Sequence, residues 1–283
     1  MAVVLDLIEL DGKATPDALA TEIIRQNPDV PLPVPIEEIA AKAGILNIQL
    51  LQSEAFEGML IANAEKSEGV VFVNQRSSRQ RRRFTIGHEL VGHFLLPWHR
   101  AMKDGSLTFE CTAEDMNAVR SGNVDARTDW EVQANEFSSE ILMPRTLFKK
   151  QMRRKDEPDL SHVRDIALLF DTSVEATARR YVALSDYAIA MVFAKGKQVR
   201  HAWKGSEFPY FLDVKKGSQL PNGSASLNDA KDDSLAEFNS IESYWWINRD
   251  RGQQPPEYIL EQTLFQRDGY RITILYVEPE EED

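Results

Sequence analysis

Hydrophobic residues near the N-terminus follow first a helical and then an extended pattern. Helical spacing holds for Ala18, Leu19, Ile23 and Ile24. Four prolines within residues 27–35 end that pattern, and Pro35–Ala43, closed by Gly44, predicts a short second helix. Three apolar runs bounded by polar residues then predict strands at Ile45–Leu51, Gly58–Ala62 and Gly69–Asn74. The last run is apolar enough to be a central strand, so a small sheet is expected in the first third of the chain.

The second half of the chain begins with two helical patterns and continues mostly as strands. Leu160–Phe170 and Ser173–Leu184 have broad apolar faces and few basic residues, so we expect packed helices rather than a DNA-binding pair. Strands are predicted at Tyr187–Ala194, Gln198–Trp203, Tyr258–Phe265 and Tyr270–Val277, the last two as a hairpin about Asp268-Gly269. Gly217–Asp233, rich in small polar residues, predicts a mobile loop. The cluster Tyr244, Trp245 and Trp246 is more typical of a core than of a pocket.

Composition and charge restrict the class of protein. A chain of 283 residues with 42% hydrophobic residues can fold as one large domain or two smaller ones. The net charge of -12 makes direct nucleic-acid binding an unfavourable interpretation, because phosphate neutralisation needs a basic face. No apolar run is long enough to cross a membrane, and no secretory signal pattern opens the chain. The one cysteine, Cys111, fits a reducing compartment, so a cytoplasmic protein is expected.

One segment, RRRFTIGHELVGHFLLPWH (81–99), contains a pattern typical of zinc hydrolases: His88 and His93 as ligands and Glu89 beside them. The usual interval between the two histidines is four residues, whereas here it is five. In a regular α-helix residues five apart lie about 140° apart and do not face one ion. A single π-type turn would absorb the added residue, which is Val91 or Gly92, and would bring the two rings back to one side.

A catalytic zinc ion usually has a third protein ligand, and Glu131 is the strongest candidate. It lies in Asp129–Pro144, a segment with helical spacing of apolar residues, and Asn135, one turn later, is placed to support a ligand. Weaker candidates are Glu136, Glu140, Cys111 and His99: the two glutamates lie on other helical faces, an isolated cysteine is usually a small buried residue, and His99 follows the expected helix end.

Two further groups of residues leave alternatives open. Residues 76–83 contain five arginines, which predict a solvated basic helix start or, alternatively, a docking patch for an acidic partner. A zinc hydrolase that attacks a carbonyl group also needs a donor for the developing oxyanion. His99, Tyr181 and His201 are candidates, and the sequence does not select among them.

Several of these segments together resemble the ImmA/IrrE family of zinc metallopeptidases. The resemblance rests on PVPIEEIAAKAGI (33–45), FEGML (56–60), VVFVN (70–74), RRFTIGHE (82–89), HFLLPWH (93–99) and EVQANEFSSEILMP (131–144). It implies that His88, His93 and Glu131 bind Zn2+ and that Glu89 is the catalytic base. It also implies a protein substrate, a helix-turn-helix transcriptional repressor cleaved in a stress or phage-related response. The family's usual motif reads HELGH, and this chain has HELVGH; the dipeptidyl peptidase III type is similar in carrying an extra residue there.

The pattern and the resemblance together predict an α+β fold in three parts. Residues 1–157 are expected to form a zincin-like metallopeptidase domain, residues 158–185 a helical segment packed on it, and residues 186–283 a β-rich regulatory or docking domain. The expected function is an intracellular zinc endopeptidase. The alternative is a catalytically impaired protein of peptidase fold that acts as a binding or regulatory partner.

Overall fold

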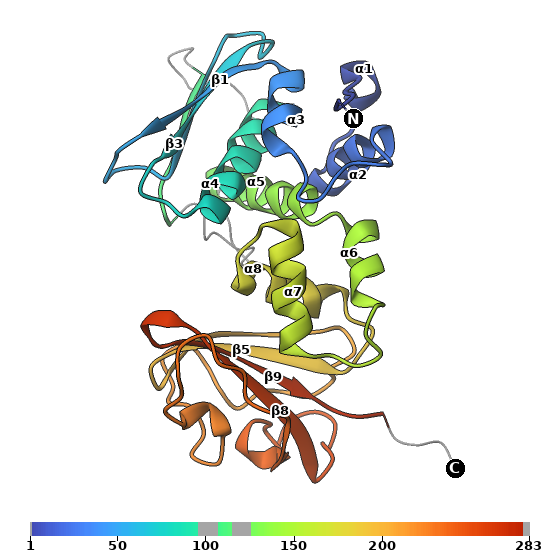
Figure 1. Cartoon of the computed structure of the whole chain (residues 1–283), viewed down its shortest axis with the longest axis vertical. Helices are drawn as coiled ribbons and strands as arrows, with labels where there is room; N and C mark the ends of the chain where they lie inside the picture. Colours follow the sequence, from blue (N-terminus) through green and yellow to red (C-terminus); the bar gives the residue numbers. More distant parts are fainter. Residues whose placement is uncertain (1, 96–106, 115–125, 280–283) are drawn as a thin grey trace. The chain divides into compact units, whose positions relative to one another are not determined.

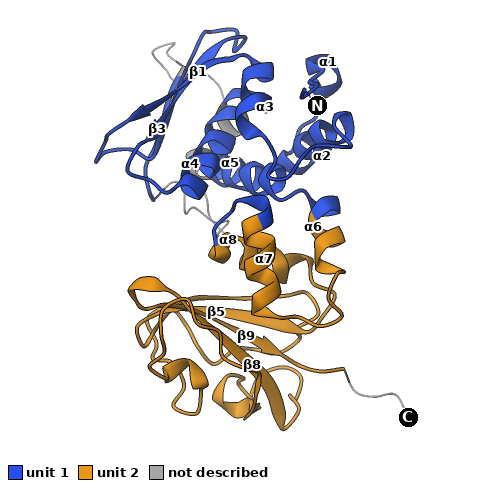
Figure 2. Cartoon of the chain, in the orientation of Figure 1, with its two compact units in different colours: residues 1–147, 169–173 blue, residues 148–168, 174–283 orange. Residues whose placement is uncertain are grey.

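The structure, a computed structural model, describes residues 2–95, 107–114 and 126–279, and for residues 91–93, 107 and 126–128 it describes the backbone alone. The chain divides into two compact units (Figure 2). Unit 1 comprises residues 1–147 and 169–173, and unit 2 comprises residues 148–168 and 174–283. Each unit combines helices with a sheet of its own, so the predicted α+β class is confirmed.

The sheet of unit 1, in which Figure 1 labels β1 and β3, has the strand order β1-β3-β2-β4. Its strands are β1 (Ile45–Leu51), β2 (Gly58–Ala62), β3 (Gly69–Asn74) and β4 (Leu107–Cys111). β1 pairs in parallel with β3, whereas β2 is antiparallel to both β3 and β4. The predicted strands coincide with β1, β2 and β3, and β3 is central as expected, with Val71 and Val73 fully buried. β4 was not predicted.

The helices of unit 1 pack against this sheet and against one another. They are α1 (Leu7–Leu10), α2 (Pro16–Gln26), α3 (Ile36–Ala43), α4 (Arg79–Gly87), the π-helix η1 (His88–Leu95) and α5 (Ala126–Leu142), with α6 (Arg145–Met152) beginning in this unit. α2, α4 and η1 all contact α5, and η1 also contacts β2. Leu60, Leu90 and Phe137 are fully buried in the core between these elements. Gly44 ends α3 in the left-handed conformation (φ 113°), as its position predicted.

The arginine-rich segment is not wholly solvated, contrary to the prediction for its last residue. Arg83 is only 5% exposed, and it donates to the backbone oxygen of Val34 at 2.7 Å. Its guanidinium also lies 3.5 Å from Asp171, which Arg79 contacts at 2.6 Å. Burial is possible because the positive charge faces a carboxylate and a carbonyl. Arg83 therefore joins segments of unit 1 and is not available to a partner.

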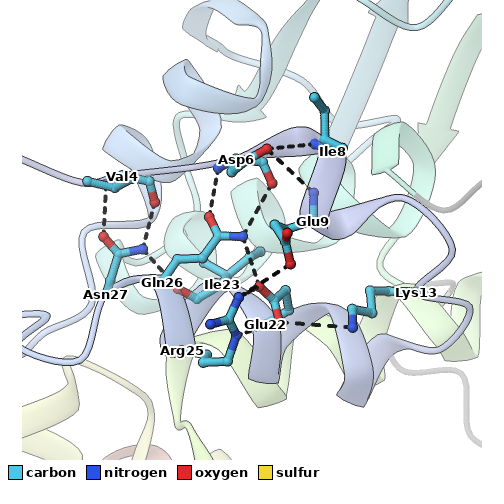
Figure 3. A network of polar contacts seen from close by, with 10 residues as sticks. All are labelled: Val4, Asp6, Ile8, Glu9, Lys13, Glu22, Ile23, Arg25, Gln26 and Asn27. Carbon is cyan, nitrogen blue, oxygen red and sulfur yellow. Dashed lines mark hydrogen bonds and ion pairs between the residues drawn. The ribbon is translucent and has the colours of Figure 1, made fainter.

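Polar side chains of α2 hold the N-terminal segment in place (Figure 3). Asn27 donates to the carbonyl oxygens of Val4 and Ile23 and accepts from the Val4 N–H, and Gln26 exchanges two hydrogen bonds with the backbone of Asp6. Asp6 in turn accepts from the first N–H groups of α1. The backbone N–H and C=O groups of Val4 and Asp6 are thus paired with side-chain amides, as they would be paired with a neighbouring strand in a sheet.

Unit 2 has an antiparallel sheet of order β6-β5-β9-β8-β7 (Figure 1). Its elements are α7 (Leu160–Phe170), α8 (Val174–Leu184), β5 (Ile189–Lys195), β6 (Gln198–Lys204), β7 (Asn239–Glu242), β8 (Tyr258–Phe265) and β9 (Tyr270–Tyr276). The predicted hairpin is present as β8 and β9. Of the aromatic cluster predicted as core, Trp246 is fully buried, and its Nε1 donates to Glu261 at 2.8 Å. Trp245 is half-buried and Tyr244 is 43% exposed, so the prediction was wrong for Tyr244.

The segment predicted as a mobile loop is packed in part. Ser226 is fully buried, Ser224 is 4% exposed, and the Ser224 hydroxyl and the Ala225 N–H both donate to the buried carboxylate of Glu261. The small polar residues that suggested mobility instead provide hydrogen-bond donors for a buried carboxylate. The segment has little regular structure besides the short helix η3 (Ala225–Leu227), but it is anchored to β8.

The two compact units do not follow the predicted ranges 1–157, 158–185 and 186–283. The break falls within α6, and α7 and α8 belong mostly to unit 2, where α8 contacts β5 and β6. The apolar faces predicted for these two helices are buried at Val163, Phe170 and Val182. As divisions of function, the three ranges stay a prediction. Among the described residues, no helix is both long and apolar enough to pass through a membrane.

Candidate metal centre

The backbone around the two histidines forms a π-helix. η1 runs from His88 to Leu95 directly after the α-helix α4, so the chain changes from i to i+4 to i to i+5 hydrogen bonding at His88. This confirms the widened turn that the five-residue interval predicted. The segment includes Val91 and Gly92 within one continuous element, so neither residue by itself forms a bulge. The side chain of His93 lies outside the described residues, and its role as a ligand stays a prediction.

His88 lies in a fully buried position at the start of η1, between two polar side chains of α5. Its Nδ1 is 3.0 Å from Oδ1 of Asn135, and its Nε2 is 3.0 Å from Oε2 of Glu131. An amide oxygen accepts a hydrogen bond, so Asn135 selects the tautomer with the proton on Nδ1 and leaves the Nε2 lone pair directed at Glu131. The structure thus brings His88 and Glu131 together, and Asn135 supports the imidazole as predicted for a second-layer group.

The close approach of η1 to α5 depends on small residues. Gly87 packs against Ser138 of α5, where a Cβ on residue 87 would lie 2.8 Å from the Ser138 hydroxyl oxygen. That hydroxyl donates to the backbone oxygen of Phe84 at 2.7 Å. Because the two helices touch at this point, His88 begins η1 within reach of the acid on α5.

Cys111 is the residue that the sequence-based interpretation undervalued. It ends β4, is fully buried, and its Sγ lies 3.2 Å from His88 Nε2 and 3.5 Å from Glu131 Oε2. Burial, together with the negative charges of Glu89 and Glu131, raises the pKa of the thiol well above its usual range. It is a buried residue, as expected, but it lies among polar donors rather than in an apolar core. No local signal marked it, because only the pairing of LTFEC (107–111) with β2 places its last residue at the site.

Glu89 lies next to this cluster. It is fully buried, and its carboxylate, His88 and Cys111 have ligand atoms that all lie within 4.8 Å of one another. Gly58 of β2 provides the space, since a Cβ there would be 2.5 Å from Glu89 Oε1. The FEGML run (56–60) therefore contributes to the site because Gly58 has no side chain to displace Glu89.

The donor set fits a zinc ion. Tetrahedral zinc, with bonds of about 2.0–2.3 Å, separates its ligand atoms by roughly 3.3–3.6 Å. The separations among His88 Nε2, Glu131 Oε2 and Cys111 Sγ are 3.0, 3.2 and 3.5 Å. One imidazole, one carboxylate and one thiol are also the donor types that zinc selects in proteins. An expansion of a few tenths of an ångström would admit the ion.

The other candidates do not join the described part of this cluster. Glu136 and Glu140 line a hollow of unit 1 together with Thr15 and Asp17 of the α2 N-terminus. His99 lies outside the described residues. Tyr181 and His201 belong to unit 2.

Those two residues have partners within unit 2. Tyr181 is 2% exposed and packs edge-on against His162, and burial raises its pKa. His201 stacks on Phe193, and its Nε2 lies 2.9 Å from the Arg179 guanidinium. Their contacts are those of structural residues.

The fold and the site together define a mixed α+β domain with a buried group of side chains that could hold a metal ion. Residues 48–181 match the family model of the IrrE N-terminal-like domain, Peptidase_M78. The match confirms the ImmA/IrrE resemblance for this part of the chain and, with the mixed α+β architecture, the zincin-like fold. Both β2–β4 and the two helices that carry His88 and Glu131 lie within the matched range.

Comparison with solved structures supports the fold. A Mycobacterium tuberculosis protein described as a transcriptional regulator is similar over 96% of this chain and 79% of that chain, with a TM-score of 0.53 and 10% sequence identity. At that identity the similarity concerns the fold alone. No curated protein matches the chain.

Proposed function

We propose that this protein is a cytoplasmic zinc-dependent endopeptidase in which His88, His93 and Glu131 bind Zn2+ and Glu89 is the general base. The observation that supports it most is the 3.0 Å approach of His88 and Glu131, which are 43 residues apart in sequence, beside the buried Glu89. The match of residues 48–181 to a metallopeptidase family supports the same proposal. The zinc ion, when bound, would lower the pKa of a water molecule and polarise the scissile carbonyl.

The chain's own residues account for the proton movements. Glu89 accepts a proton from the attacking water and passes it to the departing amine, so it acts first as base and then as acid. Asn135 holds the imidazole of His88 by its Nδ1 and fixes its orientation. Burial of Glu89 excludes bulk water, which strengthens its interaction with positive charge in the site.

For the substrate we propose a helix-turn-helix transcriptional repressor, cleaved in a stress or phage-related response. The ImmA/IrrE resemblance and the match of residues 48–181 to the IrrE N-terminal-like family support this part. The alternative is a binding or regulatory protein that keeps the peptidase fold without cleaving its partner.

The test combines metal analysis with cleavage of a helix-turn-helix repressor, for which the genes beside this one are to be searched. The purified full chain and the Glu89→Gln variant should each contain equimolar zinc. Only the wild type should cut the repressor at full rate, and Glu89→Gln should be slower by roughly 10²-fold or more. Glu136→Gln is the matched control, because Glu136 lies on α5 but lines a separate hollow. Zinc binding with equal behaviour of wild type and Glu89→Gln would favour the binding protein instead.

A further inference from the structure

Cys111 is the one donor of the cluster that the proposed mechanism does not use. Its Sγ is as close to His88 Nε2 as a metal ligand would be, and it lies on the same side as Glu131. We propose that Cys111 is an additional ligand of the metal, and that its thiolate takes the place of the attacking water and keeps the resting site closed. This inference rests on the proposed function, since it concerns the regulation of the same site.

The position of the thiol is the first argument. The attacking water must lie between the metal and the base that takes its proton, which here is Glu89. Cys111 interacts with the carboxylates of both Glu89 and Glu131, and its ligand atom lies within 4.8 Å of those of His88 and Glu89. The sulfur therefore stands where the water of a working site would stand.

The backbone holds the thiol there. Cys111 pairs with Gly58 in the antiparallel ladder of β2 and β4, and its carbonyl oxygen accepts from the Glu57 N–H at 2.9 Å. Gly58 is the residue that also makes room for Glu89. The same strand position thus fixes the base and the sulfur, and the thiol reaches the site without any rearrangement of the sheet.

The chemistry of the sulfur favours coordination. Thiolate is one of the ligands that zinc selects in proteins, and a thiol that coordinates the ion is deprotonated. The S–H bond breaks, a bond from sulfur to the metal forms, and the proton passes to Glu89 and then to solvent. With His88, His93 and Glu131 bound as well, the ion has four protein ligands, as closed zinc sites do, whereas catalytic sites keep one position open.

Cobalt provides a direct test of coordination. The chain has one cysteine, so a thiolate-to-cobalt charge-transfer band in the near ultraviolet can arise only from Cys111. We expect this band in the Co²⁺-loaded wild type and its loss in both Cys111→Ser and Cys111→Ala, with equimolar cobalt in all three. Cys111→Ser, which nearly preserves shape, guards against a packing defect, and circular dichroism of the metal-free proteins checks the fold.

A second measurement tests whether the sulfur closes the site. Acetohydroxamate needs an open position on the metal, and its binding changes the visible spectrum of cobalt. A ligand that competes with an internal group loses apparent affinity in proportion to the open fraction, so we expect Cys111→Ala to bind it about tenfold or more tightly than the wild type. Cys111→Ser should behave like Cys111→Ala, and it carries the comparison if the alanine variant does not fold.

The outcomes separate this inference from the proposed function. Cobalt bound by the wild type without a thiolate band overturns coordination by Cys111. A thiolate band with equal hydroxamate affinity in wild type and variants overturns the closed site. If neither zinc nor cobalt binds to the wild type or to the variants, the proposed metallopeptidase function itself fails.

Discussion

Glu89 and strand β2 approach more closely than any side chain on residue 58 would permit. A Cβ on Gly58 would lie 2.4 Å from Cγ2 of Thr85 and 2.5 Å from Oε1 of Glu89. Thr85 is fully buried, so it has no room to retreat. The glycine is required for space rather than for an unusual backbone angle, and any larger residue must displace the carboxylate.

The first prediction therefore concerns Gly58→Ala. Displacing a catalytic group by about 1 Å can cost on the order of 10²-fold in rate, and we expect a loss of that size in repressor cleavage. Zinc content should stay equimolar, because the atoms nearest to a Cβ on residue 58 belong to Thr85 and Glu89 and not to His88, His93, Cys111 or Glu131. Ile61→Ala is the control, since Ile61 lies on the same strand and is 44% exposed. Full activity of Gly58→Ala would show that Glu89 does not act from its present position.

At the scale of elements, the site depends on how closely α4 and η1 lie against α5. Gly87 and Ser138 are in contact where these helices approach. A Cβ on residue 87 would lie 2.8 Å from the Ser138 hydroxyl oxygen, and the next Ser138 atoms would lie 3.4 Å from it. The oxygen is therefore the single tight contact. Removing it would leave ordinary packing distances.

A double-mutant cycle tests this second prediction. Gly87→Ala should push η1 away from α5, separate His88 from Glu131 and weaken zinc binding by about tenfold or more. Ser138→Ala alone should cost about 1 kcal/mol of stability through the lost hydrogen bond to Phe84. The double variant should recover much of the zinc affinity, a coupling on the order of 1 kcal/mol. If the losses of zinc affinity in the two single variants add up in the double variant, the contact does not set the distance between the helices.

The third prediction concerns the length of the widened turn. Deletion of Val91 restores the four-residue interval, and an α-turn then replaces the π-turn, so the deletion variant should fold and retain equimolar zinc. Insertion of an alanine after Val91 exceeds what an i to i+5 turn absorbs and should abolish zinc binding. Metal analysis of both purified variants measures this. Equal zinc content in the two would argue against His93 as a ligand.

Much of unit 1 and of its site could be predicted because the deciding signals are local. The alternation and apolar runs of β1 to β3, the helical spacing around Glu131 and the interval between the histidines each depend on neighbouring residues. β4 and Cys111 could not be predicted in the same way. Their place depends on register with β2, about fifty residues away in sequence, and nothing within LTFEC identifies its partner strand. Burial of Arg83 was missed for the same reason, because Asp171 is distant in sequence.

At the scale of the whole molecule, acid should lower stability by protonating carboxylates whose charge the folded chain stabilises. In unit 1, Glu22 is 6% exposed and accepts two hydrogen bonds from Arg25, at 2.6 and 2.9 Å (Figure 3). The bonds from Arg25, with a further one from Gln26, lower the pKa of Glu22 from 4.5 to about 2. A carboxyl group with a lowered folded-state pKa stabilises the fold above its unfolded pKa and loses that effect as the pH falls through the folded value.

The fourth prediction follows from this shift. Glu22→Gln should unfold at lower urea concentration than wild type at neutral pH. The difference should begin to shrink below pH 4.5 and vanish below about 2, measured by urea titrations from about pH 7 downward. Glu9→Gln is the control, because Glu9 is exposed and its carboxylate lies 3.5 Å from the Arg25 guanidinium, farther than the 2.6 Å of Glu22. A difference that is constant across this range would mean that the Glu22 charge does not contribute.

The π-helix at His88–Leu95 also bears on how such proteins are recognised. A π-turn contains about one residue more than an α-turn. The number of residues between two histidines that face one site therefore depends on the helix type. Pattern searches that demand four residues would pass over this chain. Allowing five, when a glycine precedes the second histidine and an acid-bearing helix follows, would extend the search to other sequences that hide the same arrangement.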